Sequence, residues 1–296
     1  MKKYLTTVLF ALLLALGQTW AQTNTDFTLG KQQFAQKKYE AAITSFKKAA
    51  KAEPSKEANY LWLAKAYNQR LKRASNFMAK GTLARKMKNA YKKAVEVAPQ
   101  SVKARYSLAM YYISAPAIAG GSFTKAEKQA QAILKLNKGK GYELLGAIYQ
   151  GKKEYTAAEK AYRNSLQFSD NQAAMYYKLG MLFQTQKQYV RAFQEFGHAM
   201  KADEDYLMAY YQYARTAVFA QMQTRKGIKY LRYYISKASA KNTKIVAPTY
   251  AWWRMGKLYE LQQDTIQAKQ AYQKALQLKP ENKEAKAALE KLKETE

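Results

Sequence analysis

The chain of 296 residues contains no cysteine and only one histidine, His198. Without a thiol it can form neither a disulfide framework nor a lipid attachment at a mature N-terminal cysteine. The missing thiol excludes a catalytic Cys–His pair, a Ser–His pair would depend on His198 alone, and one imidazole cannot build a histidine-based metal site. We therefore expect no catalytic residues, no metal and no cofactor, and we interpret His198 as a surface or packing residue.

Acidic residues are scarce as well, since 21 Asp and Glu stand against 51 Lys and Arg, for a net charge of +30. Segment 58–95 holds ten Lys and Arg and no acid. This segment is either a solvated face or a source of positive potential that attracts an anionic partner. The candidate anion-binding residues are Lys65, Arg70, Lys72, Arg73, Lys80, Arg85, Lys86 and Lys88.

Long apolar runs are missing beyond the first twenty or so residues. Lys2 and Lys3 precede an apolar run of about 12 residues that ends near Leu16, and small residues before and at Ala21 fit a signal peptidase site. We expect a signal peptide over residues 1–21. An uncleaved anchor is the weaker alternative, because a bilayer span needs roughly 20 apolar residues. The mature chain is then expected without a transmembrane anchor, in the periplasm of a Gram-negative cell or secreted beyond it.

What the sequence does contain is a pattern that recurs every 34 residues. Its members are Tyr142, Leu145, Gly146, Tyr149, Ala158 and Tyr162, then Tyr176, Leu179, Gly180, Phe183, Ala192 and Phe196. The pattern returns as Trp252, Met255, Gly256, Tyr259, Ala268 and Tyr272, and in part as Leu29, Gly30, Ala42 and Phe46. Large residues three and seven positions apart share one helical face, and the small residues let two helices approach closely. A period of 34 residues predicts an array of helix–turn–helix units.

This pattern resembles the signature of the tetratricopeptide repeat (TPR) family, W-x2-LG-x2-Y followed by A-x3-F and a closing proline, over residues 23–282. The resemblance implies an all-α, right-handed superhelical solenoid of about seven hairpins. The expected repeats are 23–56, 57–101, 102–138, 139–172, 173–206, 207–248 and 249–282. Residues 283–296 are expected to form a capping helix whose apolar residues Ala285, Ala288, Leu289 and Leu292 face the last repeat.

Three of these repeats exceed the regular 34 residues, namely 57–101, 102–138 and 207–248, and the first two contain recognisable insertions. The halves of repeat 57–101 lie about 11 residues further apart than a 34-residue unit allows. We expect a longer hairpin at 68–83 that turns at Lys80-Gly81-Thr82. Repeat 102–138 contains the Ala- and Gly-rich segment 114–122, where Pro116 is expected to end the first helix. That segment lacks the Gly-Lys-Ser/Thr ending of a phosphate loop.

In the TPR family the first helices line a concave groove, and the fifth and ninth places of each repeat point into it. Here several of these places hold aromatic, Met or basic residues, which are types common in binding hot spots. They are Tyr106, Met110, Tyr177, Met181, Tyr211, Arg215, Trp253 and Lys257. Packing against the next repeat is the alternative role for each of them.

Two functions follow as hypotheses. The first is a non-enzymatic exported scaffold that binds a segment of another envelope protein, with Arg215 and Lys257 pairing with its carboxylates. The second is binding of segment 58–95 to an anionic lipid, polymer or protein. Nucleic acid fits the charge but not the expected compartment. Salt distinguishes the two, because it screens exposed charges more than groove contacts.

Overall fold

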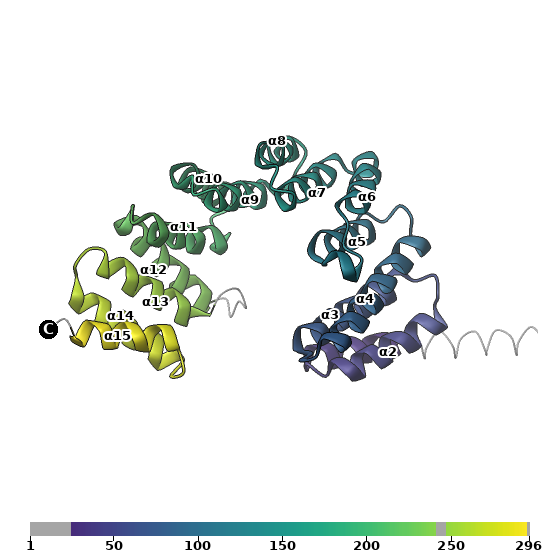
Figure 1. The fold of residues 1–296 in the computed structure, drawn as a ribbon, viewed down its shortest axis with the longest axis horizontal. Helices are drawn as coiled ribbons and strands as arrows, with labels where there is room; N and C mark the ends of the chain where they lie inside the picture. The colour runs from purple at the N-terminus through teal and green to yellow at the C-terminus, as the bar shows by residue number, and fades with distance from the viewer. Residues whose placement is uncertain (1–24, 241–246, 295–296) are drawn as a thin grey trace, which may run out of the picture. The chain divides into compact units, whose positions relative to one another are not determined.

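The computed structural model describes residues 25–240 and 247–294, and every element within those ranges is helical (Figure 1). The expectation of an all-α array of paired helices is confirmed. No helix among the described residues has both the length and the apolar character needed to cross a bilayer. The expected signal peptide, residues 1–21, lies outside the described ranges.

The chain divides into two compact units, which meet in sequence after Glu154. In unit 1, a helix over residues 25–35 is followed by α2 (Tyr39–Ala52), α3 (Glu57–Arg73), α4 (Phe77–Val97), α5 (Val102–Ser114), the short 3-10 helix η1 (Ala117–Ala119), α6 (Phe123–Leu136) and α7 (Lys138–Gly151). In unit 2, α8 (Tyr155–Leu166) precedes α9 (Gln172–Thr185), α10 (Tyr189–Ala202), α11 (Leu207–Ala220), α12 (Thr224–Ala240), α13 (Pro248–Glu260), α14 (Thr265–Leu278) and α15 (Lys283–Glu294).

Hairpins form where consecutive helices pack against each other, as α3 does with α4, α9 with α10 and α13 with α14. Small residues allow this close approach. A Cβ atom added to Gly180 would lie 2.5 Å from the ring of Phe196 on the partner helix, and that ring is fully buried. The aromatic ring of the second helix therefore occupies the space that a side chain on the first helix would need.

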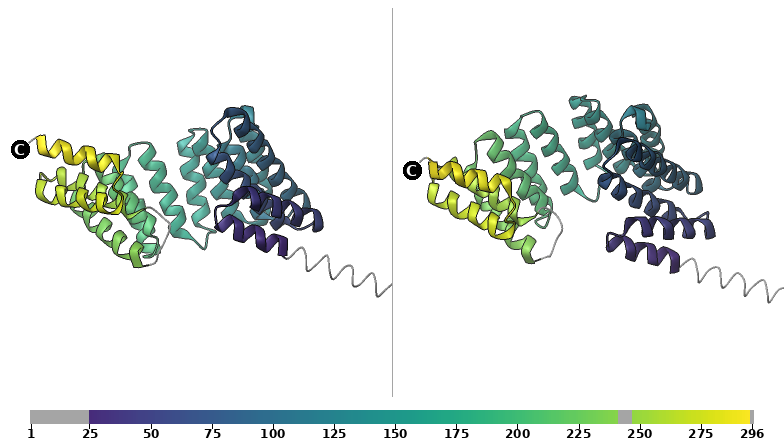
Figure 2. Two further views of the ribbon diagram at one scale, coloured as in Figure 1. Left: turned by 90° about the horizontal axis from the view of Figure 1, so that it is seen from below. Right: turned by 60° about the horizontal axis from the view of Figure 1, so that its bottom comes forward.

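The tail forms the capping helix that was expected. In the views of Figure 2, α14 and α15 lie side by side at the yellow end of the ribbon, and Ala285 and Ala288 are buried. Asn282 holds the junction, since its Oδ1 accepts a hydrogen bond from the Ala285 amide (3.1 Å) and its Nδ2 donates to the Thr249 hydroxyl (3.1 Å). The polar face of α15 thus closes the apolar end of the last hairpin.

The long hairpin of unit 1 is confirmed, but its predicted turn is wrong. Helix α3 has 17 residues and α4 has 21, whereas α5 and α6 have 13 and 14. The chain turns before Asn76, whose Oδ1 accepts from the Ala79 amide (2.7 Å) and caps α4. Gly81, predicted in the turn, lies inside α4, because one glycine in a long helix costs only about 1 kcal/mol. Helix α5 ends two residues before Pro116, as expected.

Candidate functional site

The residues predicted to line the groove all lie on the first helices of their hairpins. Tyr106 and Met110 lie on α5 of unit 1, and the other six lie on α9, α11 and α13 of unit 2. In unit 2, α11 contacts both α9 and α13, so these three helices form one layer. The six residues Tyr177, Met181, Tyr211, Arg215, Trp253 and Lys257 are therefore carried by one continuous set of helices.

Several of the predicted groove residues already have partners within the chain, and three of them illustrate this. The Tyr106 hydroxyl donates to the buried carboxylate of Glu143 (2.9 Å), which also pairs with Lys140 (2.7 Å). Lys257, predicted to meet a ligand carboxylate, pairs with Glu260 at 2.9 Å. Tyr211 is only 5% exposed and packs against Tyr234, with 5.4 Å between ring centres.

These contacts separate packing residues from accessible ones. For Tyr211 the packing alternative holds, because the ring belongs to the core between α11 and α12. Lys257 brings no uncompensated charge, because Glu260 lies one turn further along α13. The accessible part of the predicted groove is thus smaller than the sequence indicated.

Two arginines on neighbouring first helices, Arg215 on α11 and Arg254 on α13, form what we call the arginine pair. The Arg254 guanidinium lies 5.0 Å from the ring centre of Tyr211 and 5.1 Å from that of Trp253. The guanidinium of Arg215 lies 5.1 Å from the ring of Phe219. Neither arginine pairs with a carboxylate among the described residues. Their charges face aromatic rings instead of acids.

Burial and neighbouring charges shift the pKa values of the groups in and around the arginine pair. Desolvation by burial lowers the pKa of the Arg254 guanidinium, the nearby Tyr211 opposes that effect, and the positive charge of Arg215 adds to it. Burial raises the pKa of Tyr211, and both guanidinium groups oppose that rise. Arginine stays charged at neutral pH despite such shifts. The layer of first helices therefore carries two partly desolvated positive charges close together.

Two buried hydrogen-bond donors, one in the pair and one next to it, have no acceptor among the described residues. They are the Nε of Arg215 and the indole Nε1 of Trp253. The hydrogen bond that Arg215 donates through its Nη1 to the side-chain oxygen of Gln212 is long, at 3.3 Å. A buried donor left without an acceptor costs about 1–3 kcal/mol. Uncompensated charge and unused donors together describe a site suited to an anionic group.

Sequence reasoning missed Arg254 because it considered only the fifth and ninth places of each repeat. A signal for it was present in the sequence. The positions three and four residues away on α13 are Tyr250, Ala251, Lys257 and Leu258, none of which is acidic. Since ion pairs within a helix form at those spacings, Arg254 could be expected to lack a partner on its own helix.

The eight candidate anion-binding residues of segment 58–95 do not form one surface. Lys65 stacks on Trp62 (4.5 Å), Arg73 stacks on Tyr39 (4.5 Å) and Arg70 forms an ion pair with Glu40. These side chains engage their own helix or the first hairpin. A different group, Lys72, Lys80, Arg85 and Lys88, lines a separate cavity near the start of α4. Lys86 is exposed outside both groups.

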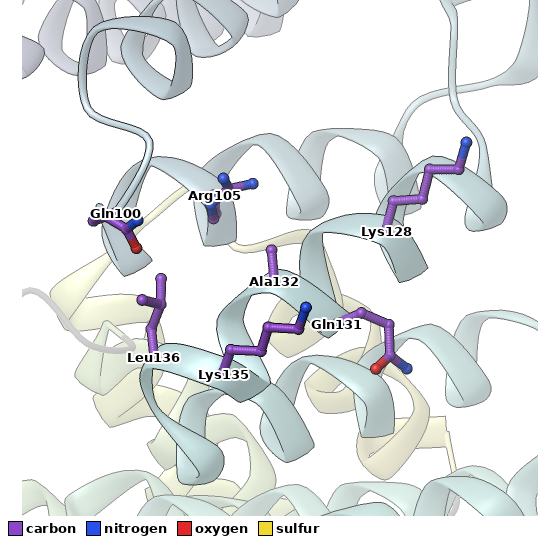
Figure 3. Close-up of a pocket in the computed structure, with 7 residues that line it drawn as sticks. All are labelled: Gln100, Arg105, Lys128, Gln131, Ala132, Lys135 and Leu136. Carbon is purple, nitrogen blue, oxygen red and sulfur yellow. The ribbon is translucent and has the colours of Figure 1, made fainter.

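Another basic cavity lies between α5 and α6 and is shown in Figure 3. It has a volume of about 350 Å³ and is lined in part by Arg105, Lys128 and Lys135. The guanidinium of Arg105 is already used, because it donates to the Pro99 carbonyl (2.7 Å) and to the side chain of Gln129 (3.0 Å). This cavity offers no donor set comparable to the arginine pair.

The single histidine, His198, lies on the surface of α10 and contacts its neighbours there. His198 is exposed, its ring lies 5.2 Å from that of Tyr176, and its Nδ1 is 3.5 Å from Glu195. Its expected role as a surface or packing residue is confirmed. No group of acidic or histidine side chains among the described residues could hold a metal ion.

Stacked helical hairpins define a class, the helical-repeat proteins. Within that class, residues 27–56, 139–172 and 249–282 each match a model of the tetratricopeptide repeat. The chain therefore carries tetratricopeptide repeats within an all-helical array of paired hairpins. No curated protein matches the sequence.

Several solved structures share the fold. A TPR protein of Thermus thermophilus is 20% identical, with a TM-score of 0.51, over 66% of this chain and 99% of that one. A TPR protein of Parabacteroides merdae is 15% identical, with a TM-score of 0.52, over 92% and 98% of the two chains. The Pseudomonas aeruginosa protein pilF is 14% identical, with a TM-score of 0.53, over 82% and 99%. At these identities the likeness shows the fold alone.

Proposed function

We propose that this protein is an exported, non-enzymatic TPR scaffold of the cell envelope that binds a carboxylate-bearing segment of a partner protein on the first helices of unit 2. The arginine pair carries the proposal, because its two charges have no acidic partner among the described residues. Placement in the envelope rests on the signal peptide expected at residues 1–21.

A carboxylate suits the arginine pair better than other groups on a protein surface. The planar guanidinium presents N–H groups in pairs that match the two oxygens of a carboxylate, and such charge-assisted bonds are about twice as strong as neutral ones. Either an acidic side chain or a chain terminus supplies this group. Trp253 and the partly buried Tyr177 stand beside it and offer apolar contact to the rest of the segment.

The test uses defined peptides in place of an unknown partner. Fluorescently labelled peptides with acidic residues and free C-termini are compared with the same peptides made neutral by amidation and by Gln and Asn substitution. We expect the acidic set to contain binders whose affinity falls about tenfold or more in Arg215→Gln and in Arg254→Gln. Losing a hydrogen bond to a charged group costs about 1.5–3 kcal/mol, and 1.4 kcal/mol is a factor of ten.

Arg225→Gln is the matched control, since Arg225 is exposed on α12 of the same unit and its loss removes the same charge. Its affinity should stay within about twofold of wild type, as expected for a solvated charge. Circular dichroism checks that all variants are equally helical. Equal weakening by Arg225→Gln would mean that only net charge attracts the peptides, and the proposed site would be wrong. Unchanged binding in both Arg215→Gln and Arg254→Gln would contradict it as well.

A further inference from the structure

The three most exposed large apolar side chains among the described residues lie at one place in unit 1. Phe77, Met78 and Ile118 are 76%, 81% and 84% exposed, and all three line one cavity of about 680 Å³. The cavity lies between the end of α3, the start of α4 and η1. We call it the basic–apolar cavity. Exposed apolar side chains gathered at one place mark a surface that binds a protein, a membrane or a ligand.

Four cations surround this apolar group. Lys72, Lys80, Arg85 and Lys88 line the cavity, and no acidic residue does. None of the four forms an ion pair with a described residue, in contrast to Arg70, which pairs with Glu40. Their charges therefore remain available to an anionic partner.

Hydrogen bonds anchor η1 and the residue that ends its loop to α5, and η1 also packs against α4, so the cavity is formed in advance. The Tyr111 hydroxyl donates to the Ala119 carbonyl (2.6 Å), and the Ser122 amide donates to the Tyr112 carbonyl (2.9 Å). Gly120 has a φ of 90°, which favours glycine, and a Cβ there would lie 2.5 Å from the Lys88 ammonium. Two departures from the regular repeat, the long hairpin and segment 114–122, thus meet at this surface.

We propose that the basic–apolar cavity docks on an anionic lipid bilayer. Phe77, Met78 and Ile118 enter the boundary between head groups and acyl chains, and the four cations pair with lipid phosphates. Amphipathic surfaces bind membranes by this combination of buried apolar area and attraction to anionic lipids. A bilayer fits better than an acidic peptide, because most of the surface of each of the three apolar side chains remains exposed although they line the cavity. This binding uses unit 1 and is independent of the arginine pair.

The absence of cysteine makes a site-specific test possible. In the full chain, Met78→Cys takes a single environment-sensitive fluorophore. On vesicles of phosphatidylcholine mixed with phosphatidylglycerol we expect its emission to shift to the blue, and we expect salt to reverse the shift. Ile266→Cys is the matched control, because Ile266 is 71% exposed but lies on α14, far along the chain from segment 58–95. Its label should not shift.

Lys80→Gln combined with Arg85→Gln tests the charges, and this variant should need about tenfold more lipid, or more, for the same shift of the label. Both positions are exposed, and circular dichroism verifies folding. The proposal is overturned if the label at position 78 does not shift at low salt, or if pure phosphatidylcholine shifts it equally. Binding to vesicles without a label shift, or a shift with a soluble acidic peptide but not with vesicles, would also overturn it.

Discussion

Gly180 shows at the scale of one residue why the repeat keeps a small side chain on its first helix. The ring of Phe196, 16 positions further along the chain, fills the space where a Cβ would lie, and Tyr272 does the same at Gly256. Both rings are fully buried and cannot move into solvent. The signature glycine and the signature aromatic are therefore two halves of one packing contact.

We predict that Gly180→Ala destabilises the protein although alanine favours helix. Overpacking costs about 1–3 kcal/mol, and helix propensity returns at most about 1 kcal/mol. Gly197→Ala is the control on the partner helix, because nothing lies within 4 Å of its added Cβ. It should raise the free energy of unfolding by about 0.5–1 kcal/mol. Urea unfolding measures both free energies. Changes of the same sign in the two variants would show that the contact with Phe196 does not determine the effect of Gly180→Ala.

Helices α11 and α12 pack against each other through tyrosines, and these side chains make the stability of the α11–α12 interface depend on pH. Tyr210 packs on Tyr233 (4.6 Å between ring centres) and Tyr213 packs on Tyr230 (4.8 Å). Desolvation by burial is the main cause that raises the pKa of Tyr210 and of Tyr213 to about 12, from an ordinary 10.0. Burial thus favours the neutral phenols in the folded state.

The sign of the pH effect follows from these raised pKa values. Below pH 10 both states are protonated and the stabilisation is fully present. Above pH 10 the unfolded chain ionises first, so the free energy of unfolding falls as the pH rises towards about 12. We predict that Tyr210→Phe with Tyr213→Phe reduces this alkaline loss, measured by urea unfolding across that range. Tyr189→Phe on α10 is the control, and an equal effect from it would contradict the assignment to the α11–α12 interface.

At the scale of the whole molecule the excess of positive charge dominates. With 51 basic and 21 acidic residues, one-to-one pairing leaves thirty cations without an acid. Repulsion among these cations opposes the compact state. Salt weakens the repulsion, since the Debye length falls from about 30 Å at 0.01 M to about 8 Å at 0.15 M.

We therefore predict that the midpoint of thermal unfolding rises with sodium chloride over this range. Circular dichroism at the helical band measures it, and an unchanged helical signal at low temperature serves as the control for a folded starting state. A midpoint that falls with salt would mean that ion pairs such as Arg163 with Glu195 outweigh the repulsion.

The elements predicted from sequence were right where the information is local. The signature residues of each hairpin lie within one repeat, so the period shows which residues pack and why Gly180 must be small. The turn before α4 was misplaced although its signal is also local, because the prediction relied on Gly81 and overlooked the helix cap that Asn76 forms with the Ala79 amide.

The sequence alone determined an all-helical array of TPR hairpins with a capping helix, since the residues that pack within a repeat recur at short, regular intervals in the sequence. Only the tertiary structure decided which charges find partners. Lys257 meets Glu260, while Arg254 meets aromatic rings and a second arginine. It also brought Phe77 and Ile118, from different hairpins, to one cavity. Such outcomes depend on contacts between distant segments, which a spacing pattern does not encode.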